Sequence, residues 1–182
     1  MKQIIIFLQL FIIVNINSIA QKPQENTTYT DNYLNKFEGN WIWKSGDDTV
    51  ELSLKKTLNK IEGFDNSYWE NILGCHRYVK NGILVESSMN IYDSLQYYYS
   101  FDMSKVGVFL YHFDWWGDTI VVKGGIIDIS KEKTNEIKLN YLGGNPAQIR
   151  MQLSLKGAKI SLPGKPYIPG ITLPTDIILT KE

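Results

Sequence analysis

The chain has 182 residues, of which 43% are hydrophobic and 21% are charged, the composition of an ordinary globular protein. Its 19 basic and 19 acidic side chains balance, which argues against a nucleic-acid-binding protein, because such proteins normally carry a basic face. The single cysteine excludes an intrachain disulfide and a thiolate-rich metal site, and two histidines limit histidine-based chemistry to one pair.

The first segment has the features of a targeting sequence. Lys2 precedes an apolar run over residues 4–14, and Ser18-Ile19-Ala20 supplies the small residues that a signal peptidase reads. Polar residues interrupt the run, which is shorter than the ~20 residues of a membrane-spanning helix. We therefore expect a signal peptide over 1–20, export to the periplasm or the outside, and no transmembrane segment after cleavage. Residues 21–30 are polar and predict a flexible leader.

The first half of the remaining chain predicts consecutive hairpins. Asp31 can cap a short helical turn over 32–37, which Gly39 ends. Alternation of polar and apolar residues then predicts a hairpin of strands 41–44 and 50–55, joined by a turn. A strand over 72–80 is followed by Asn81-Gly82, a strong hairpin signal, and by a return strand over 83–85.

The second half is less regular. Residues 90–118 are ambiguous: 93–99 suits a helical turn, whereas 106–113 is rich in strand formers. Gly124-Gly125 separates two apolar runs and predicts either a hairpin or a strand with a glycine bulge. Three further segments complete the chain: a hairpin of strands 137–141 and 149–155, a proline-rich crossing over 162–174, and a strand over 175–180 that is apolar enough to be covered on both sides.

This pattern predicts one all-β domain over residues 31–182. Consecutive hairpins with one apolar face must close on each other, because an open sheet leaves an unpaired edge. An antiparallel up-and-down barrel is the expected architecture, and a two-sheet β-sandwich is the alternative.

Gly39-Asn40-Trp41, which opens the first strand after a short helical turn, resembles the G-x-W feature of lipocalins. In that superfamily the tryptophan plugs the closed end of the barrel. The chain is also similar to an uncharacterised family of secreted lipocalin-like proteins from Bacteroidota, through segments 37–46, 78–82, 144–150 and 173–181. The resemblance implies a lipocalin-like barrel and export, and it implies no activity. Arg150 is expected on the polar face of its strand, so the arginine that packs on the lipocalin tryptophan is not identified.

The inward face of the predicted barrel is the candidate site for a small apolar or amphipathic ligand. Side chains expected in the interior, besides the site residues, are Val50, Ile137 and Leu155. The candidate ligand-binding residues are Trp41, Trp43, Leu52, Leu54, Leu139, Tyr141, Met151 and Leu153, with Trp115 and Trp116 at the barrel mouth. At the mouth, the tryptophans could stack on a flat ligand with Asp114 and Asp118 as polar partners. The same residues also suit a filled core: one tryptophan would pack in it, and the two acids would cap a turn before the next strand.

No catalytic, metal or cofactor motif is present in the sequence. Cys75 and His76 are adjacent in a strand and face opposite sides, so Cys75 is expected to be a buried structural thiol. His76, His112 and Asp114 have no spacing typical of a metal site. The sequence thus predicts a non-enzymatic ligand-binding barrel, with a filled structural or envelope-interaction barrel as the alternative and a barrel enzyme ranked last. It says nothing of the oligomeric state.

Overall fold

The structure is a computed structural model, and it describes residues 26–61, 63, 66–95, 106–112, 121–157 and 168–182. Eight antiparallel strands follow each other around a closed barrel in the order β4-β3-β2-β10-β9-β8-β7-β6. The barrel closes because β6 pairs with β4 (Ile72 opposite Leu110), and β10 pairs with β2 (Lys181 opposite Trp41). This confirms the up-and-down barrel rather than the sandwich.

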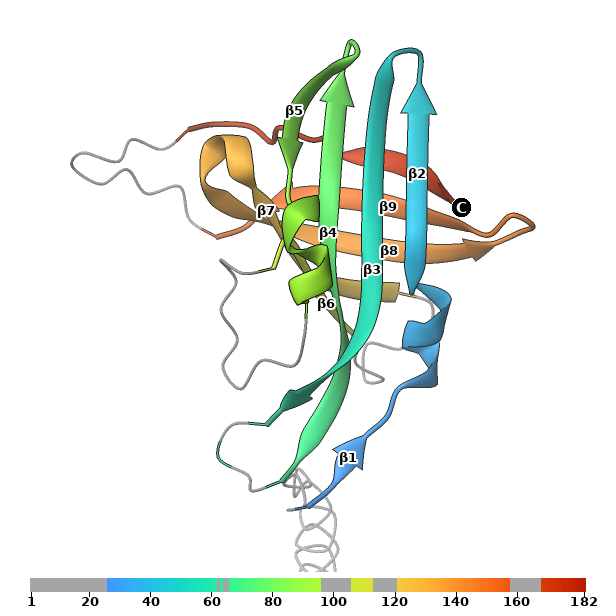
Figure 1. The fold of residues 1–182 in the computed structure, drawn as a ribbon, viewed down its shortest axis with the longest axis vertical. Coiled ribbons are helices and arrows are strands. Elements are labelled where there is room, and N and C mark those ends of the chain that lie inside the picture. The colour runs from blue at the N-terminus through green and yellow to red at the C-terminus, as the bar shows by residue number, and fades with distance from the viewer. Residues whose placement is uncertain (1–25, 62, 64–65, 96–105, 113–120, 158–167) are drawn as a thin grey trace, which may run out of the picture.

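Most of the strands are longer than the sequence pattern predicts, whereas β6 is shorter than the segment 106–113 that is rich in strand formers. Their bounds are β2 Gly39–Ser45, β3 Asp48–Lys60, β4 Tyr68–Lys80, β5 Ile83–Ser87, β6 Val108–Tyr111, β7 Val121–Asp128, β8 Lys133–Gly143, β9 Gln148–Leu155 and β10 Asp176–Lys181. Figure 1 shows β2, β3 and β4 side by side, running across β7, β8 and β9 behind them. The barrel is therefore flattened into two crossed layers with the apolar core between them.

The N-terminal part closes one end of the barrel. The 3₁₀ helix η2 (Asn32–Lys36) begins after Asp31, whose carboxylate accepts a hydrogen bond from Tyr33 N–H, as a helix cap should. Leu34 and Phe37 are fully buried and belong to the core. Before η2, β1 (Thr28–Tyr29) pairs in parallel with the start of β4, so these two residues of the expected flexible leader are held in the sheet. We call this the η2 end.

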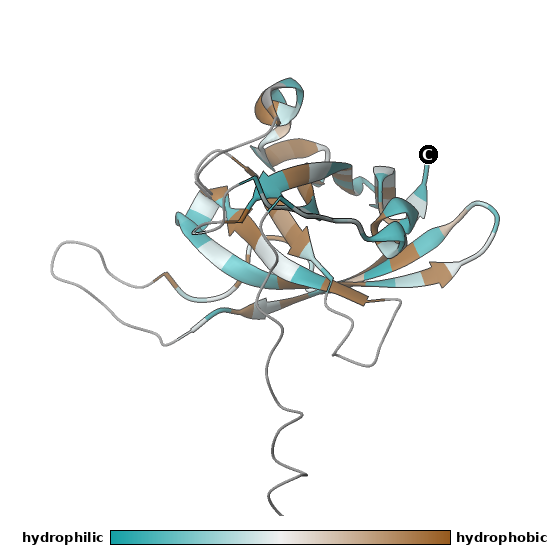
Figure 2. Cartoon of the chain, turned by 90° about the horizontal axis from the view of Figure 1, so that it is seen from below, coloured by the Kyte–Doolittle hydropathy of each residue, from teal (hydrophilic) through white to brown (hydrophobic). Residues whose placement is uncertain are grey.

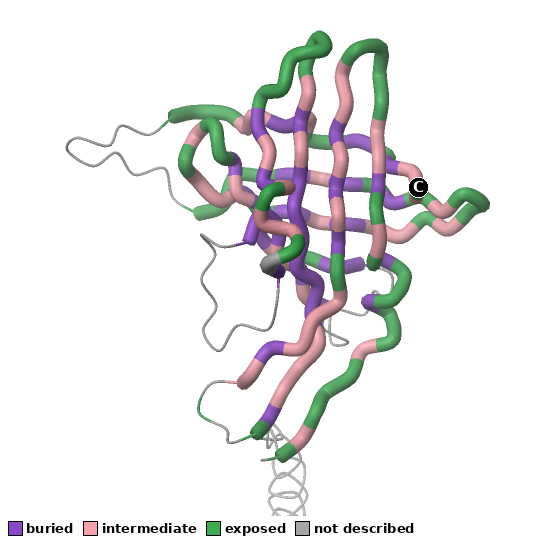
Figure 3. Tube along the Cα trace, viewed as in Figure 1, coloured by how far each residue is buried: buried purple, intermediate pink, exposed green. Residues whose placement is uncertain are grey.

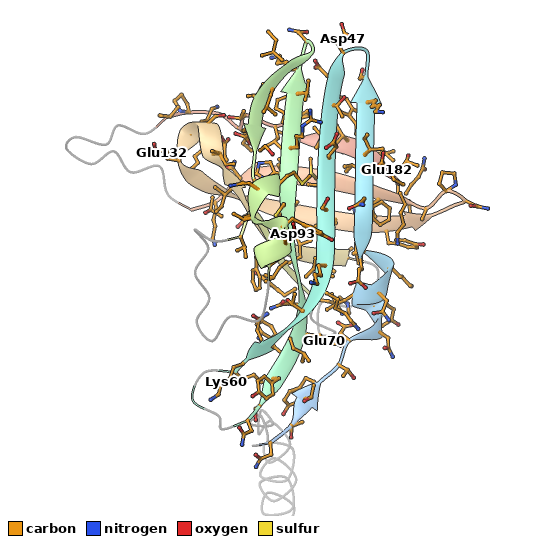
Figure 4. All side chains as sticks on the ribbon, viewed as in Figure 1. Asp47, Lys60, Glu70, Asp93, Glu132 and Glu182 are labelled. Atoms are coloured by element: carbon orange, nitrogen blue, oxygen red, sulfur yellow. The ribbon has the colours of Figure 1, made fainter. Side chains whose placement is uncertain are left out.

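The opposite end carries the hairpin β2–β3, the hairpin β4–β5, the 3₁₀ helix η6 (Ile129–Lys131) and the chain over 168–175. We call residues 168–175 the strap and this end the strap end. Leu173 of the strap is 2% exposed and belongs to the same core cluster as the strands. Residues 168–174, the described part of the predicted proline-rich crossing, therefore close this end of the barrel. Figure 4 labels Asp47 and Glu132 at the strap end, and Glu70 and Lys60 toward the opposite end.

Strand β4 is buried on both faces over residues 71–76. The 3₁₀ helix η3 (Met89–Ser94) packs on the outer face of β4. A second apolar cluster, Leu73, Cys75, Leu95 and Val106, lies there. Figure 3 shows the buried residues concentrated along the middle of the barrel, whereas the hairpin tips are exposed.

Three expectations are wrong in detail. Gly124-Gly125 lies within one continuous strand, β7, with regular pairing to both neighbours, so it is neither a hairpin nor a bulge. A Cβ at Gly124 would collide with the backbone of Phe109, so the glycine allows β6 to lie close to β7. Strand β10 is not covered on both sides, because Ile178 is 47% exposed; Leu155, the last residue of β9, is 36% exposed and is not interior.

Candidate functional site

The predicted ligand-binding side chains lie together inside the barrel, but they pack against each other. Trp41, Leu52, Leu54, Leu139 and Met151 are at most 1% exposed, and Leu153 is 8% exposed. Trp43 and Tyr141 are half-buried and contact the same cluster. Trp115 and Trp116, with Asp114 and Asp118, lie outside the described residues. Figure 2, which views the barrel from below, shows hydrophobic and hydrophilic residues alternating along the strands.

The exposure values show how tightly this interior is filled. A side chain that borders a water-sized void keeps accessible surface on the side facing the void. Leu52, Leu54, Leu139 and Met151 keep none. The centre of the described barrel is therefore packed as an ordinary protein core is packed.

Trp41 is buried near η2, in contact with Phe37 and with Lys181 of β10. Its indole N–H donates to the carbonyl of Phe37 at 2.8 Å, and the Lys181 ammonium lies 5.3 Å from the centre of the indole ring. The cation over Trp41 is therefore a lysine of β10, whereas Arg150 is exposed and pairs with Asp176. Gly39 makes room for Lys181, since a Cβ at Gly39 would lie 2.8 Å from the lysine Cε.

A polar network also surrounds η2. The Asp31 carboxylate lies 2.7 Å from Nδ1 of His112, and the Asp31 N–H donates to Glu70, which pairs with Lys56 at 3.0 Å. His112 thus contacts a carboxylate at the η2 end, whereas His76 contacts Glu86 of β5. The two histidines are not brought to one site. Among the described residues no group of three or more histidine, cysteine or acidic side chains could hold a metal ion.

Buried polar side chains form a layer at the strap end, and these are the site residues that sequence reasoning missed. His76 lies opposite Leu52 on the inner face of β4, and its Nε2 is 3.1 Å from the Glu86 carboxylate. Both side chains are buried, at 0% and 1% exposure. Alternation along β4 places His76 on the inner face, so this residue could have been found; its partner on β5 could not.

The charge of Glu86 is maintained by its hydrogen bonds. Burial alone would raise the pKa of this carboxyl, but the contacts with His76 and with Ser130 outweigh burial and hold the pKa below its ordinary value. The second oxygen of Glu86 accepts the Ser130 N–H at 2.9 Å, which attaches η6 to β5.

Asp128, at the end of β7, is the second carboxylate of the layer and is fully buried. It accepts hydrogen bonds from the Thr172 N–H at 2.8 Å and the Thr172 hydroxyl at 2.7 Å, and from the Lys131 N–H at 3.1 Å. The amide nitrogen of Asn135, also fully buried, lies 3.4 Å away. Asp128 therefore holds η6, β8 and the strap together.

Ser88, His76 and Glu86 stand in the order of a hydrolase triad, with Ser88 Oγ 3.2 Å from His76 Nδ1. The serine, however, is 7% exposed, and its hydroxyl also contacts the backbone N–H and carbonyl of His76. Gly107 lies directly over it, since a Cβ there would collide with the hydroxyl. A nucleophile must reach its substrate, so this serine is a structural link between β4 and η3.

Cys75 is a buried thiol on the outer face of β4, as its position predicts. Burial raises the pKa of the thiol to about 11, and hydrogen bonds with Ser88 and Gly107 offset only part of the increase. A thiol with this pKa is protonated at neutral pH, so Cys75 has no nucleophilic role.

On the outer surface of the described residues, β5 carries three consecutive exposed apolar side chains. Ile83, Leu84 and Val85 of β5 are exposed in succession, at 71%, 55% and 39%. Among the described strands β5 pairs only with β4, and a register shift interrupts this pairing. These residues belong to the predicted hairpin, but their exposure is not evident from their composition.

Comparisons with known proteins bear on the family alone. Within the described part of the chain, no helix has the length and apolarity needed to cross a membrane. No curated protein and no solved structure matches the chain. A family described as "Family of unknown function (DUF6705)" matches residues 1–182, and the chain belongs to this family.

Proposed function

We propose that this protein is exported and binds a small amphipathic ligand at the strap end of its barrel. The proposal keeps the ligand-binding function expected from the sequence but moves the site from the centre of the barrel to its end. The packed side chains at the centre leave little space for a ligand. The strap end has polar groups of the kind that fix a ligand's orientation.

The buried polar layer is the observation that carries the proposal. Burying polar groups costs free energy even when they are paired, so a core built only for stability would place apolar side chains there. The layer holds two carboxylates, Glu86 and Asp128, with His76 and Asn135, all at most 4% exposed. Thr172 of the strap bonds to Asp128, and the next residue, Leu173, is buried in the core although it is carried by the strap rather than by the barrel wall.

Native mass spectrometry of the protein purified from its own host tests the binding function. A bound molecule of constant mass that leaves on denaturation is the expected result. Protein that is free of bound molecules, and that takes up no alkyl compound in the titrations described below, would refute it. Sequencing of the mature N-terminus tests export, and we expect it to begin at Gln21.

A filled barrel that binds another protein is the second candidate, and the exposed Ile83-Leu84-Val85 run favours it. Exposed apolar residues on an edge strand commonly mark an interaction site. Leu84→Lys would then abolish cross-linking to a partner while leaving ligand uptake unchanged. The opposite pattern favours the ligand-binding function: substitutions at the strap end change ligand uptake, and Leu84→Lys has no effect.

A further inference from the structure

The strap places an amphipathic group in the end of the barrel. Thr172 presents two hydrogen-bond donors to the Asp128 carboxylate, at 2.7 and 2.8 Å. The next residue, Leu173, inserts a branched aliphatic side chain into the core, and Ile171 packs against the same core cluster. A donor group followed by an aliphatic group thus fills this end of the barrel in the structure.

The groups that face Thr172 are hydrogen-bond acceptors. Asp128 is fully buried and would lose two of its donors if the strap moved away. The side-chain oxygen of Asn135 is buried and has no hydrogen-bond partner among the described residues. Its amide nitrogen is directed toward Asp128, so this acceptor belongs to the same cluster. Whatever replaces Thr172 must therefore donate hydrogen bonds.

Charge favours a cation in this position. Asp128 and the nearby Glu86 are both carboxylates, and Glu86 is joined to the neighbouring residue of η6 through Ser130 N–H. An anionic ligand would be repelled by these two carboxylates in a poorly solvated site. An ammonium group would instead form charge-assisted hydrogen bonds with Asp128.

The basic residues near the strap act on its outer part. Lys131 Nζ donates to the carbonyl of Pro169 at 2.8 Å, and Lys133 Nζ donates to the carbonyls of Ile168 and Gly170. These bonds are exposed and precede the inserted residues. The two lysines can hold residues 168–170 in place while residues 171–173 move. Their ammonium groups then remain bonded to the strap carbonyls and do not enter the site.

We propose that the strap end binds an aliphatic ammonium compound, whose head group pairs with Asp128 and Asn135 and whose alkyl body takes the place of Leu173. This inference rests on the proposed function and specifies its ligand class. The strap residues 171–173 would be the resident occupant that the ligand displaces.

Chain-matched alkyl compounds test the inference, using the mature protein and titration calorimetry below the micelle concentration. We expect decylammonium to bind about tenfold tighter than decanoate, with decanol between them, since a charge-assisted bond is stronger than a neutral one. Thr172→Val removes one strap donor and should increase the affinity for decylammonium. Asp128→Asn should bring the decylammonium and decanoate affinities close together, whereas Asp176→Asn, an exposed carboxylate at the same end, should not.

The outcomes separate the two proposals. If decanoate binds as tightly as decylammonium, the head-group inference is overturned and ligand binding stands. If none of the three compounds binds saturably, in the natural protein or in Thr172→Val, the proposed function fails. Should Asp128→Asn not fold, decyltrimethylammonium replaces it as the test: this cation has no N–H donor, so it must bind the natural protein more weakly than decylammonium, and equal affinity refutes the inference.

Discussion

Replacing Leu139 by alanine measures how well the centre of the barrel is packed. Leu139 lies on β8 between Val122 of β7 and Met151 of β9, and all three side chains have no accessible surface. In a packed core, a Leu→Ala change removes buried apolar surface and leaves a cavity, so the free energy of unfolding should fall by about 3 to 5 kcal/mol. A leucine that already borders a ligand cavity would lose less, about 2 kcal/mol or under, because fewer contacts disappear.

The measurement is equilibrium urea unfolding of the natural protein and the variant, with equal slopes required for the comparison. Leu155→Ala is the matched control: it is the same substitution at the exposed end of β9, and it should change stability by no more than about 0.5 kcal/mol. Benzene should bind to the Leu139→Ala variant and not to the natural protein, because only the variant has an apolar cavity. A loss below about 2 kcal/mol, or benzene binding by the natural protein, would contradict the packed centre.

Three further predictions follow from individual residues. Cys75 should resist alkylation at pH 8 in the folded protein and react after unfolding, because its buried thiol has a pKa of about 11; rapid native labelling would contradict this. Gly39→Ala should lower stability by about 1 kcal/mol or more, since φ is +121° and the new Cβ meets Lys181; an unchanged urea midpoint would contradict the account of G-x-W. The pKa of Glu86 is lowered in the folded state, so its contribution is present above the unfolded pKa and lost as pH falls through the folded one. Glu86→Gln should therefore flatten the acid limb of the stability profile, and an unchanged limb would contradict the assignment.

Alternation of polar and apolar residues predicted an all-β fold, with the barrel as the expected architecture and a two-sheet sandwich as the alternative. The period of two specifies which side chains turn inward, and a closed sheet is the way for consecutive hairpins to bury them without an exposed edge. Trp41, Leu52, Leu139 and Met151 are buried where this argument places them. The cap at Asp31 was also predictable, because it depends on a local contact between residues two positions apart.

Tertiary structure decided the rest, because the decisive contacts join residues that are distant in the chain. Lys181 lies over Trp41 only because β10 closes the barrel against β2, and Thr172 reaches Asp128 only because the strap crosses the end of β7. Burial depends on what covers a face: η3 makes Cys75 internal, while nothing among the described residues covers Ile83. Local pattern therefore determined the strands and their inward faces. The three-dimensional closure of the barrel determined which polar groups became buried together, and with them the site.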